Sequence, residues 1–302
     1  MKFGKLQNID HVDFSLPPIP KETYSLLQRT PKLNTPKFSF GCTGWSMKEW
    51  VGSYYPAQSK TKDFLYHYSR QFNTIELNTT HYRIPKPSTI KQWYEQSSAN
   101  FKFAPKIPQV ISHSTDLGLS NNTIELFCES IKGLKEKLGI SFMQLPPTFG
   151  PKRLSILKSF LDRFPTNEVP LAIELRHEDW FNNPNNYKNL MTLLGARAVG
   201  VVLTDVAGRR DVLHMHLTTP IATIRFVGNN LVPSDYERID SWVHTLKNWI
   251  QMGLQEVYFF AHQPDNLQTP ETCTYLIEQV NKVCNWDLKV PKKIINAQMQ
   301  LF

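Results

Sequence analysis

The chain has 302 residues, of which 41% are apolar and 20% are charged, a composition typical of globular proteins rather than disordered or fibrous ones. No apolar run approaches the ~18 residues that a membrane span requires. The first residues, MKFGKLQNIDHVDF, contain no apolar block of the kind found in signal peptides. We therefore expect no membrane partner, and the cytoplasm is the default location.

The net charge of +8 lies mostly near the two ends of the chain. Residues 1–37 carry six Lys or Arg against three acids, and residues 289–302 carry three Lys and no acid, which leaves +2 for residues 38–288. We predict an N-terminal extension (1–37), one barrel domain (38–288) and a short basic C-terminal tail (289–302). The near-neutral body argues against an extensive nucleic-acid surface, but a local nucleic-acid contact stays open.

Eight short apolar runs follow one another between residues 38 and 263, and each ends in one or two polar or charged residues. Six of the seven gaps are long enough for a helix, and we expect the short gap at 207–220 to be a loop or a single turn. This alternation is typical of parallel strands with helical crossovers, and eight repeats predict a closed (β/α)8 TIM barrel. The runs are 38–45, 73–78, 101–108, 141–146, 171–177, 198–206, 221–228 and 256–263.

Helical patterns are clearest in five of these gaps, after the last run, and in the N-terminal extension. There, KETYSLLQR lies between two proline-containing segments and predicts one short helix. The six crossover patterns lie at 61–72, 88–97, 121–139, 153–164, 233–253 and 269–283.

Polar side chains at the strand ends are the candidate functional residues, because TIM barrels carry their chemistry at the carboxyl ends of the strands. Side chains alternate along a strand, so Glu76 shares a face with Asn78, and Glu174 shares a face with Arg176. If these groups face the interior, they form one set. It comprises Thr43, Glu76, Asn78, Lys106, Gln144, Glu174, Arg176, Asp205, Arg225 and His262.

The charges in this set predict an internally paired network, because an unpaired buried ion costs several kcal/mol. The bases suit an anionic substrate group such as a phosphate. Among the acids, Glu76 and Glu174 could share general acid and base work, oriented by Asn78, Gln144 and Asp205. A salt-bridge lattice without catalytic work is the alternative. The three acids are Glu76, Glu174 and Asp205, and the three bases are Lys106, Arg176 and Arg225.

Aromatic and histidine side chains follow the first two strands. They could form a wall for a sugar or a base, or a packed loop at the barrel rim. After the second strand, His81 is a candidate proton-transfer group, with a backbone hydrogen bond as the simpler interpretation, and Tyr82 lies beside it. The candidate wall consists of Trp45, Trp50, Tyr54 and Tyr55.

A metal-dependent isomerase or nuclease is a competing interpretation, since the set contains oxygen and nitrogen ligands. No close ligand spacing such as H-E-x-x-H supports it. Lys106 and Arg176 would also repel a cation, so we expect no metal and no cofactor. The His214–His216 pair could bind a metal across a strand, but we expect no ligand role. The possible ligands in the set are Glu76, Glu174, Asp205 and His262.

Six motifs in chain order resemble the YecE-like family, which is catalogued as domain of unknown function 72. The resemblance runs from about residue 41 to 283 and implies a TIM-barrel fold without an established reaction. The motifs are GCTGW (41–45), WVGSYYP (50–56), FNTIELNTTHY (72–82), KIPQVISH (106–113), QLPPTF (144–149) and AIELRHEDW (172–180).

The resemblance also implies which positions belong to the family's motifs. This chain departs from the family pattern where Val227 replaces a histidine, and where FAH (260–262) replaces F-N-N, so that His262 could substitute for a lost polar group. Asp205 and Arg225 match weaker motifs. The stronger matches are Trp45, Glu76, Asn78, Tyr82, Lys106, His113, Gln144, Glu174, Arg176, His177 and Trp180.

The last five residues, QMQLF, resemble the peptides by which bacterial replication and repair proteins dock on the sliding clamp. Gln298 would form hydrogen bonds, and Leu301 and Phe302 would fill an apolar cleft. The alternative is that Leu301 and Phe302 pack on the chain's own barrel. The sequence thus predicts an enzyme acting on a small phosphate-bearing ligand, or an accessory protein of DNA metabolism recruited through this tail.

Overall fold

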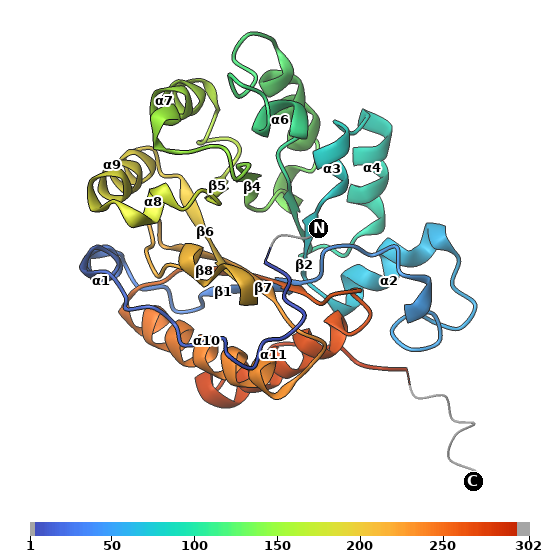
Figure 1. Ribbon diagram of the computed structural model, residues 1–302. Coiled ribbons are helices and arrows are strands. Elements are labelled where there is room, and N and C mark those ends of the chain that lie inside the picture. Colours follow the sequence, from blue (N-terminus) through green and yellow to red (C-terminus); the bar gives the residue numbers. More distant parts are fainter. Residues whose placement is uncertain (1–3, 295–302) are drawn as a thin grey trace.

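Eight parallel strands surrounded by helices form the body of the computed structural model, which describes residues 4–294 (Figure 1). This confirms the predicted alternating α/β organisation. The strands are β1 (Lys37–Gly41), β2 (Thr74–Leu77), β3 (Lys102–Pro105), β4 (Ser141–Gln144), β5 (Leu171–Glu174), β6 (Gly200–Asp205), β7 (Ile221–Val227) and β8 (Glu256–His262).

Regular ladders join these strands into a six-stranded sheet, in the order β1-β8-β7-β6-β5-β4, and a separate β2-β3 pair. Single backbone hydrogen bonds link the pair to both edges of the sheet. The Glu76 amide donates to the Cys42 carbonyl at 3.0 Å, and the Ile107 amide donates to the Phe142 carbonyl at 2.9 Å. At Gly41, a Cβ would lie 1.9 Å from the Thr74 carbonyl oxygen, so only glycine permits this approach of β1 to β2.

Helices follow most strands, as predicted. The gap at 207–220 contains only a 3-10 turn at Ala207–Val212. Helix α9 was not among the predicted helices, although Asn183 caps it through bonds to two backbone amides and Pro184 begins it. The helices are α1 (Lys21–Arg29), α2 (Phe64–Gln71), α3 (Thr79–Tyr82), α4 (Pro87–Gln96), α5 (Gln109–Ser112), α6 (Thr123–Lys132), α7 (Leu154–Arg163), α8 (Asp179–Asn182), α9 (Pro184–Gly195), α10 (Pro233–Met252) and α11 (Thr269–Cys284).

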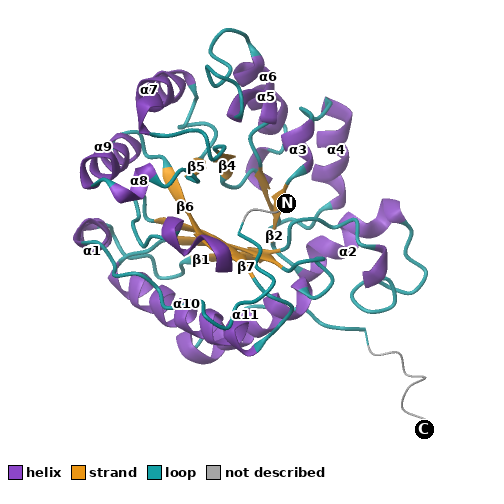
Figure 2. Cartoon of the chain, viewed as in Figure 1, coloured by secondary structure: helices purple, strands orange, loops and turns teal. Residues whose placement is uncertain are grey.

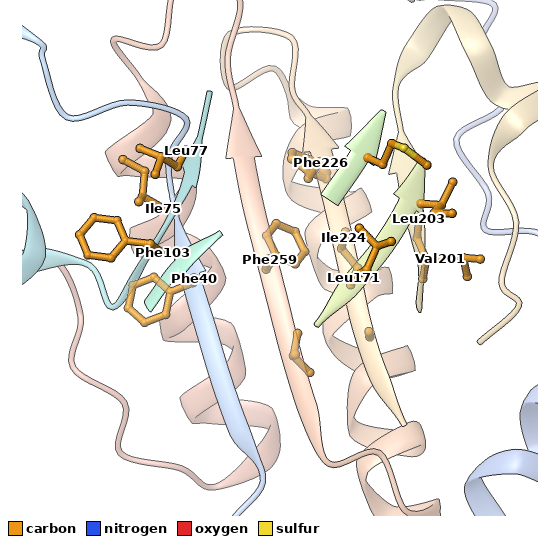
Figure 3. Packing of buried hydrophobic residues seen from close by; sticks show 14 of the residues in the cluster. Phe40, Ile75, Leu77, Phe103, Leu171, Val201, Leu203, Ile224, Phe226 and Phe259 are labelled. Atoms are coloured by element: carbon orange, nitrogen blue, oxygen red, sulfur yellow. The ribbon is translucent and has the colours of Figure 1, made fainter. Parts of the chain in front are cut away.

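Side-chain alternation divides the core into two parts. The larger cluster lies between strands and helices, and includes Ile224 and Phe226 of β7 (Figure 3). Between these two residues, Arg225 points to the opposite face of the strand, in line with the period of two. A smaller apolar cluster lies on this second face, and includes Phe142 of β4 and Phe260 of β8. It forms the apolar floor beneath the polar strand ends.

Within residues 4–36, the N-terminal extension consists of loop and the predicted helix, α1 (Figure 2). Thr23 of α1 ties it to the body: its hydroxyl donates to the Met215 carbonyl at 3.0 Å and accepts from the Leu217 amide at 2.9 Å. At the other end, the described part of the basic tail runs along α2, where the Lys292 amide donates to Gln71 Oε1 at 3.0 Å. The predicted docking residues Gln298, Leu301 and Phe302 lie outside the described residues.

Between residues 4 and 294, no helix is both long and apolar enough to cross a bilayer.

Candidate functional site

A cavity of about 360 Å³ opens at the carboxyl ends of the strands. Seven of the ten polar residues expected at the strand ends line it, so the structure brings these seven together in one place. The described residues that line it are Lys5, Thr43, Glu76, Asn78, Tyr82, Lys106, Arg176, Thr204, Val206, Arg225, Val227, His262, Gln263, Pro264 and Asn266.

Arg225 lies at the centre of the charged groups and bridges two carboxylates from distant strands. Its Nε and Nη2 donate to the two oxygens of Glu76 at 2.8 and 2.9 Å, and its Nη1 donates to Glu174 Oε2 at 2.7 Å. Burial works against the charged guanidinium, but Glu174 and Glu76 outweigh it and raise the Arg225 pKa. We call Glu76, Lys106, Gln144, Glu174, Arg176, Arg225 and His262 the charged cup.

Both carboxylates of the charged cup are fully buried and fully engaged. Asn78 also donates to Glu76 at 3.0 Å, while Glu174 accepts from Arg176 Nε at 2.9 Å and from Gln144 Nε2 at 2.8 Å. Burial alone would raise their pKa values, but the neighbouring cations prevail. Arg225, with the hydrogen bond from His262, holds the pKa of Glu76 well below its usual value, and Arg176 with Arg225 lowers the pKa of Glu174 to about 2.

Lys106 is the cation of the charged cup whose charge changes near neutral pH. It is 1% exposed, and its Nζ donates to Gln144 Oε1 at 3.0 Å above the Phe142 ring of the floor. Burial, with the charge of Arg225 as a second cause, lowers the pKa of Lys106 to about 8. Gln144 does not line the cavity itself, but joins Lys106 to Glu174 and so positions the ammonium.

His262 occupies the inner face of β8, opposite Val227 of β7. Its Nε2 lies 2.9 Å from Glu76 Oε2, and burial lowers its pKa. A neutral imidazole that donates from Nε2 to Glu76 fits this environment. The side chain expected to substitute for a lost polar group is therefore at the cavity wall.

Asp205 does not belong to the charged cup, and its predicted inward orientation is wrong. Its carboxylate points to the helix side of the sheet, where it accepts from Trp242 Nε1 at 2.8 Å, lies 2.8 Å from Arg238 Nη2 in an ion pair, and also pairs with Arg210. Thr204, one residue earlier, lines the cavity instead. Strand β6 carries apolar residues on both faces, because one face packs on the smaller apolar cluster and the other on the helices. The sequence GVVLTDV therefore does not reveal whether Thr204 or Asp205 faces inward.

Of the two alternatives for the aromatic side chains that follow the first strand, the structure favours a packed rim loop over a wall. Trp50, Tyr54 and Tyr55 are buried in the larger apolar cluster. The ring of Trp45 packs edge-on against Trp93, with centroids 5.8 Å apart, and does not line the cavity. Among the aromatic side chains predicted at this rim, Tyr82 lines the cavity, with 77% of its surface exposed.

His81 lies beside the cavity rather than in its wall. Its Nδ1 is 3.0 Å from the Ile107 carbonyl oxygen, which matches the simpler interpretation of a backbone hydrogen bond. Burial lowers its pKa to about 4, and its ring packs edge-on against His113, with centroids 5.4 Å apart. A catalytic role for His81 stays a prediction.

Within residues 4–294, no group of three or more His, Cys, Asp or Glu side chains is arranged to hold a metal ion. In the charged cup, the Arg225 guanidinium lies between Glu76 and Glu174, where a metal bridging these carboxylates would have to bind. The His214 and His216 rings are buried and pack against Tyr187.

Comparison with known proteins identifies the family. The sequence profile described as "Protein of unknown function DUF72" matches residues 39–294. This chain belongs to the DUF72 family. The DUF72 protein is 32% identical to the UPF0759 protein YecE of Escherichia coli (strain K12) over 260 residues, which are 80% of this chain and 92% of YecE. The UPF0759 protein YunF of Bacillus subtilis (strain 168) is 25% identical over 150 residues, 48% of this chain and 52% of YunF.

Solved structures support the fold. A DUF72 family protein of Enterococcus faecalis V583 superposes with a TM-score of 0.65 at 21% identity, covering 84% of this chain and 100% of that one. A second, from Thermotoga maritima MSB8, gives a TM-score of 0.59 at 23% identity, covering 83% and 100%. The family model over residues 39–294 and the 32% identity to YecE confirm the predicted family.

Proposed function

We propose that this DUF72 protein is an enzyme that binds a small anionic, phosphate-bearing substrate at the charged cup and moves a proton through Lys106. The observation that carries the proposal is the charge of the cup. With Asp205 on the other face of the sheet, the described residues of the charged cup supply two carboxylates against three cations: Lys106, Arg176 and Arg225.

An excess positive charge at the base of a cavity favours an anion. Arg225 engages both carboxylates and Arg176 engages Glu174. Lys106 and Arg176 also line the cavity, where an ammonium and a guanidinium suit the oxygens of a phosphate or carboxylate. The His262 imidazole is neutral at pH 7, because its pKa is lowered, and adds no further charge. A volume of about 360 Å³ lies near the lower end of small-molecule sites, which favours a metabolite-sized ligand.

The geometry favours Lys106 over the carboxylates for proton transfer. Glu76 and Glu174 have lowered pKa values and accept hydrogen bonds on all four oxygens, so they are poor general acids and bases near neutral pH. Glu76 and Glu174 also both pair with the Arg225 guanidinium. This arrangement disfavours a glycosidase, in which two carboxylates flank the bond to be cleaved. A lysine with a pKa of about 8 can accept or donate a proton at physiological pH. Glu76 and Glu174 then position Arg225.

The proposal includes a closed (β/α)8 barrel as the scaffold. Its support is the backbone hydrogen bonds that flank the β2-β3 pair, at Glu76 and Ile107, and the bridges Phe103–Leu138 and Lys106–Phe142 between β3 and the β4 side. An inner apolar cluster contributed by several strands is also typical of such a barrel.

Titration calorimetry with inorganic phosphate tests the binding step. Lys106→Met is expected to weaken phosphate binding by about tenfold or more, because it removes a buried charge from the cavity. Lys137→Met is the matched control: Lys137 is also a buried lysine, 5% exposed, but its Nζ donates to the carbonyls of Tyr94 and Ser97 away from the cavity. Absence of phosphate binding to the wild type, or equal losses in both variants, would refute an anion site at Lys106.

A second candidate is recruitment to a sliding clamp through QMQLF. It is favoured by the anchoring of the preceding segment, since the Ile294 amide donates to the Ser53 carbonyl, and Lys293 pairs with Glu271 at 2.6 Å. Residues 295–302 therefore follow a fixed point on the surface. Deleting residues 298–302 is expected to abolish clamp binding in calorimetry, and binding equal to that of the intact chain would end the idea.

A further inference from the structure

The N-terminal arm, residues 4–15, crosses the mouth of the cavity, although it lies outside the segment that matches the DUF72 family. In Figure 1 it runs in dark blue across the strands toward their centre. Lys5 lines the cavity, and its Nζ donates to the Pro264 carbonyl, after β8, at 3.0 Å. The Gly4 carbonyl accepts from the Gly208 amide, after β6, at 2.9 Å. The arm therefore bridges the loops that follow β6 and β8.

Two contacts fix this crossing. Gly4 adopts a φ of 71° and lies so close to Val206 that a Cβ would be 2.7 Å from the valine Cγ2, which explains a glycine here. Further along the arm, Arg210 Nη2 donates to the carbonyls of Phe14 and Ser15 at 3.2 and 3.0 Å.

Asp205 supports this anchor from behind. It pairs with both Arg210 and Arg238, and the Arg238 guanidinium lies 4.8 Å from the centre of the Phe14 ring. The buried acid on the outer face of β6 thus holds the two arginines that contact the arm, and it does not line the cavity itself.

We propose that Lys5 is a ligand-binding residue, and that the ligand carries a second anionic group which reaches Lys5 at the mouth while the first binds Lys106 and Arg176. The Lys5 ammonium has three hydrogens and the Pro264 carbonyl accepts one, so it can donate to a ligand oxygen as well. This inference rests on the proposed function, since the first anionic group occupies the charged cup. A mouth crossed by the chain's own backbone also favours a small molecule over a polymer.

Comparing pyrophosphate with inorganic phosphate tests the second contact, by calorimetry on the full chain. Lys5→Met is expected to weaken pyrophosphate binding by about tenfold and phosphate binding by less than about twofold. Lys32→Met removes the same charge from an exposed loop and is expected to change neither. Gly4→Ala leaves every charge in place but strains the arm at Val206, and is expected to weaken pyrophosphate selectively.

The outcomes separate the two proposals. If the wild type binds both anions and Lys5→Met leaves pyrophosphate affinity unchanged, the role of Lys5 is wrong, while the anion site in the charged cup stands. If Lys5→Met weakens phosphate and pyrophosphate binding equally, Lys5 contacts the first anionic group, and the proposed contact with a second anionic group is wrong. If the wild type binds neither anion, the proposed function itself fails. Thermal unfolding of each variant separates lost binding from lost folding.

Discussion

Two networks of buried arginines lie on opposite faces of the same sheet, and they differ in charge and access. The inner network holds Arg225 between Glu76 and Glu174, at the base of a cavity. The outer network lies between strand β6 and helix α10, where Arg238, 1% exposed, pairs with Asp205 and Asp235. Both satisfy the rule that buried charges are paired.

The two networks differ in the charged residues and the open space that surround their ion pairs. The inner network has additional cations, Lys106 and Arg176, that line an open cavity, whereas in the outer network Arg210 completes a set of two acids and two arginines. A buried ion pair is weak evidence for function, because structural networks use the same contacts. An excess of positive charge beside a cavity distinguishes the inner network, as a candidate binding site, from the outer network, which has a purely structural arrangement.

The largest expected effect is on stability, from Arg225→Met at the centre of the inner network. It leaves two buried carboxylates without their main partner, so we expect the free energy of unfolding at pH 7 to fall by about 3–5 kcal/mol. Urea unfolding measures it. A loss below about 1 kcal/mol would mean that the carboxylates are hydrated or otherwise paired.

The same variant makes a prediction about pH. In the wild type, Glu76 and Glu174 have pKa values below the usual 4.5, so their contribution to stability is present above that pH and is lost as pH falls toward about 2. In Arg225→Met this contribution is missing, so the difference in unfolding free energy between the two proteins should shrink from pH 7 to pH 3. A difference that stays constant with pH would contradict the pairing.

In the outer network, Asp205→Asn should lower the free energy of unfolding by about 3 kcal/mol, because Arg238 and Arg210 lose a buried partner. Phosphate affinity should stay within about twofold of the wild type, since Asp205 does not line the cavity. Parallel urea unfolding and calorimetry decide it. A tenfold loss of phosphate affinity in a folded variant would erase the distinction between the networks.

Sulfate binding should weaken as pH rises, because sulfate keeps its charge between pH 7 and 9 while Lys106, with a pKa of about 8, loses its own. We expect up to about a tenfold loss over that range. Calorimetry at several pH values gives the slope, which should disappear in Lys106→Met. The same slope in both proteins would assign the titration to another group.

The smallest effect is expected at Tyr82. Its ring is 77% exposed at the cavity rim, so Tyr82→Ala should reduce phosphate affinity by about twofold at most. A tenfold loss would instead place this ring against the ligand.

The sequence predicted the inner network better than the outer one. In IATIRFV, one charged residue interrupts an apolar strand, so alternation alone places Arg225 opposite Ile224 and Phe226. In GVVLTDV, apolar residues occupy both faces and alternation cannot orient Asp205. That orientation depends on Arg238 and Trp242 of α10, which are distant in sequence.

Other features depended on contacts that no local pattern records. Lys5 reaches the cavity because the arm docks on Gly208 and Pro264, both more than 200 residues away in the sequence. The start of α9, by contrast, carried a local signal in Asn183 and Pro184 that could have identified it.

A crystal structure grown with sulfate tests the central claim most directly. We expect density for the anion inside the cavity, within hydrogen-bond distance of Lys106 Nζ and the Arg176 guanidinium, with the Glu76–Arg225–Glu174 bridge intact. Sulfate found only at surface lysines, with the charged cup filled by water, would contradict an anion site at the strand ends.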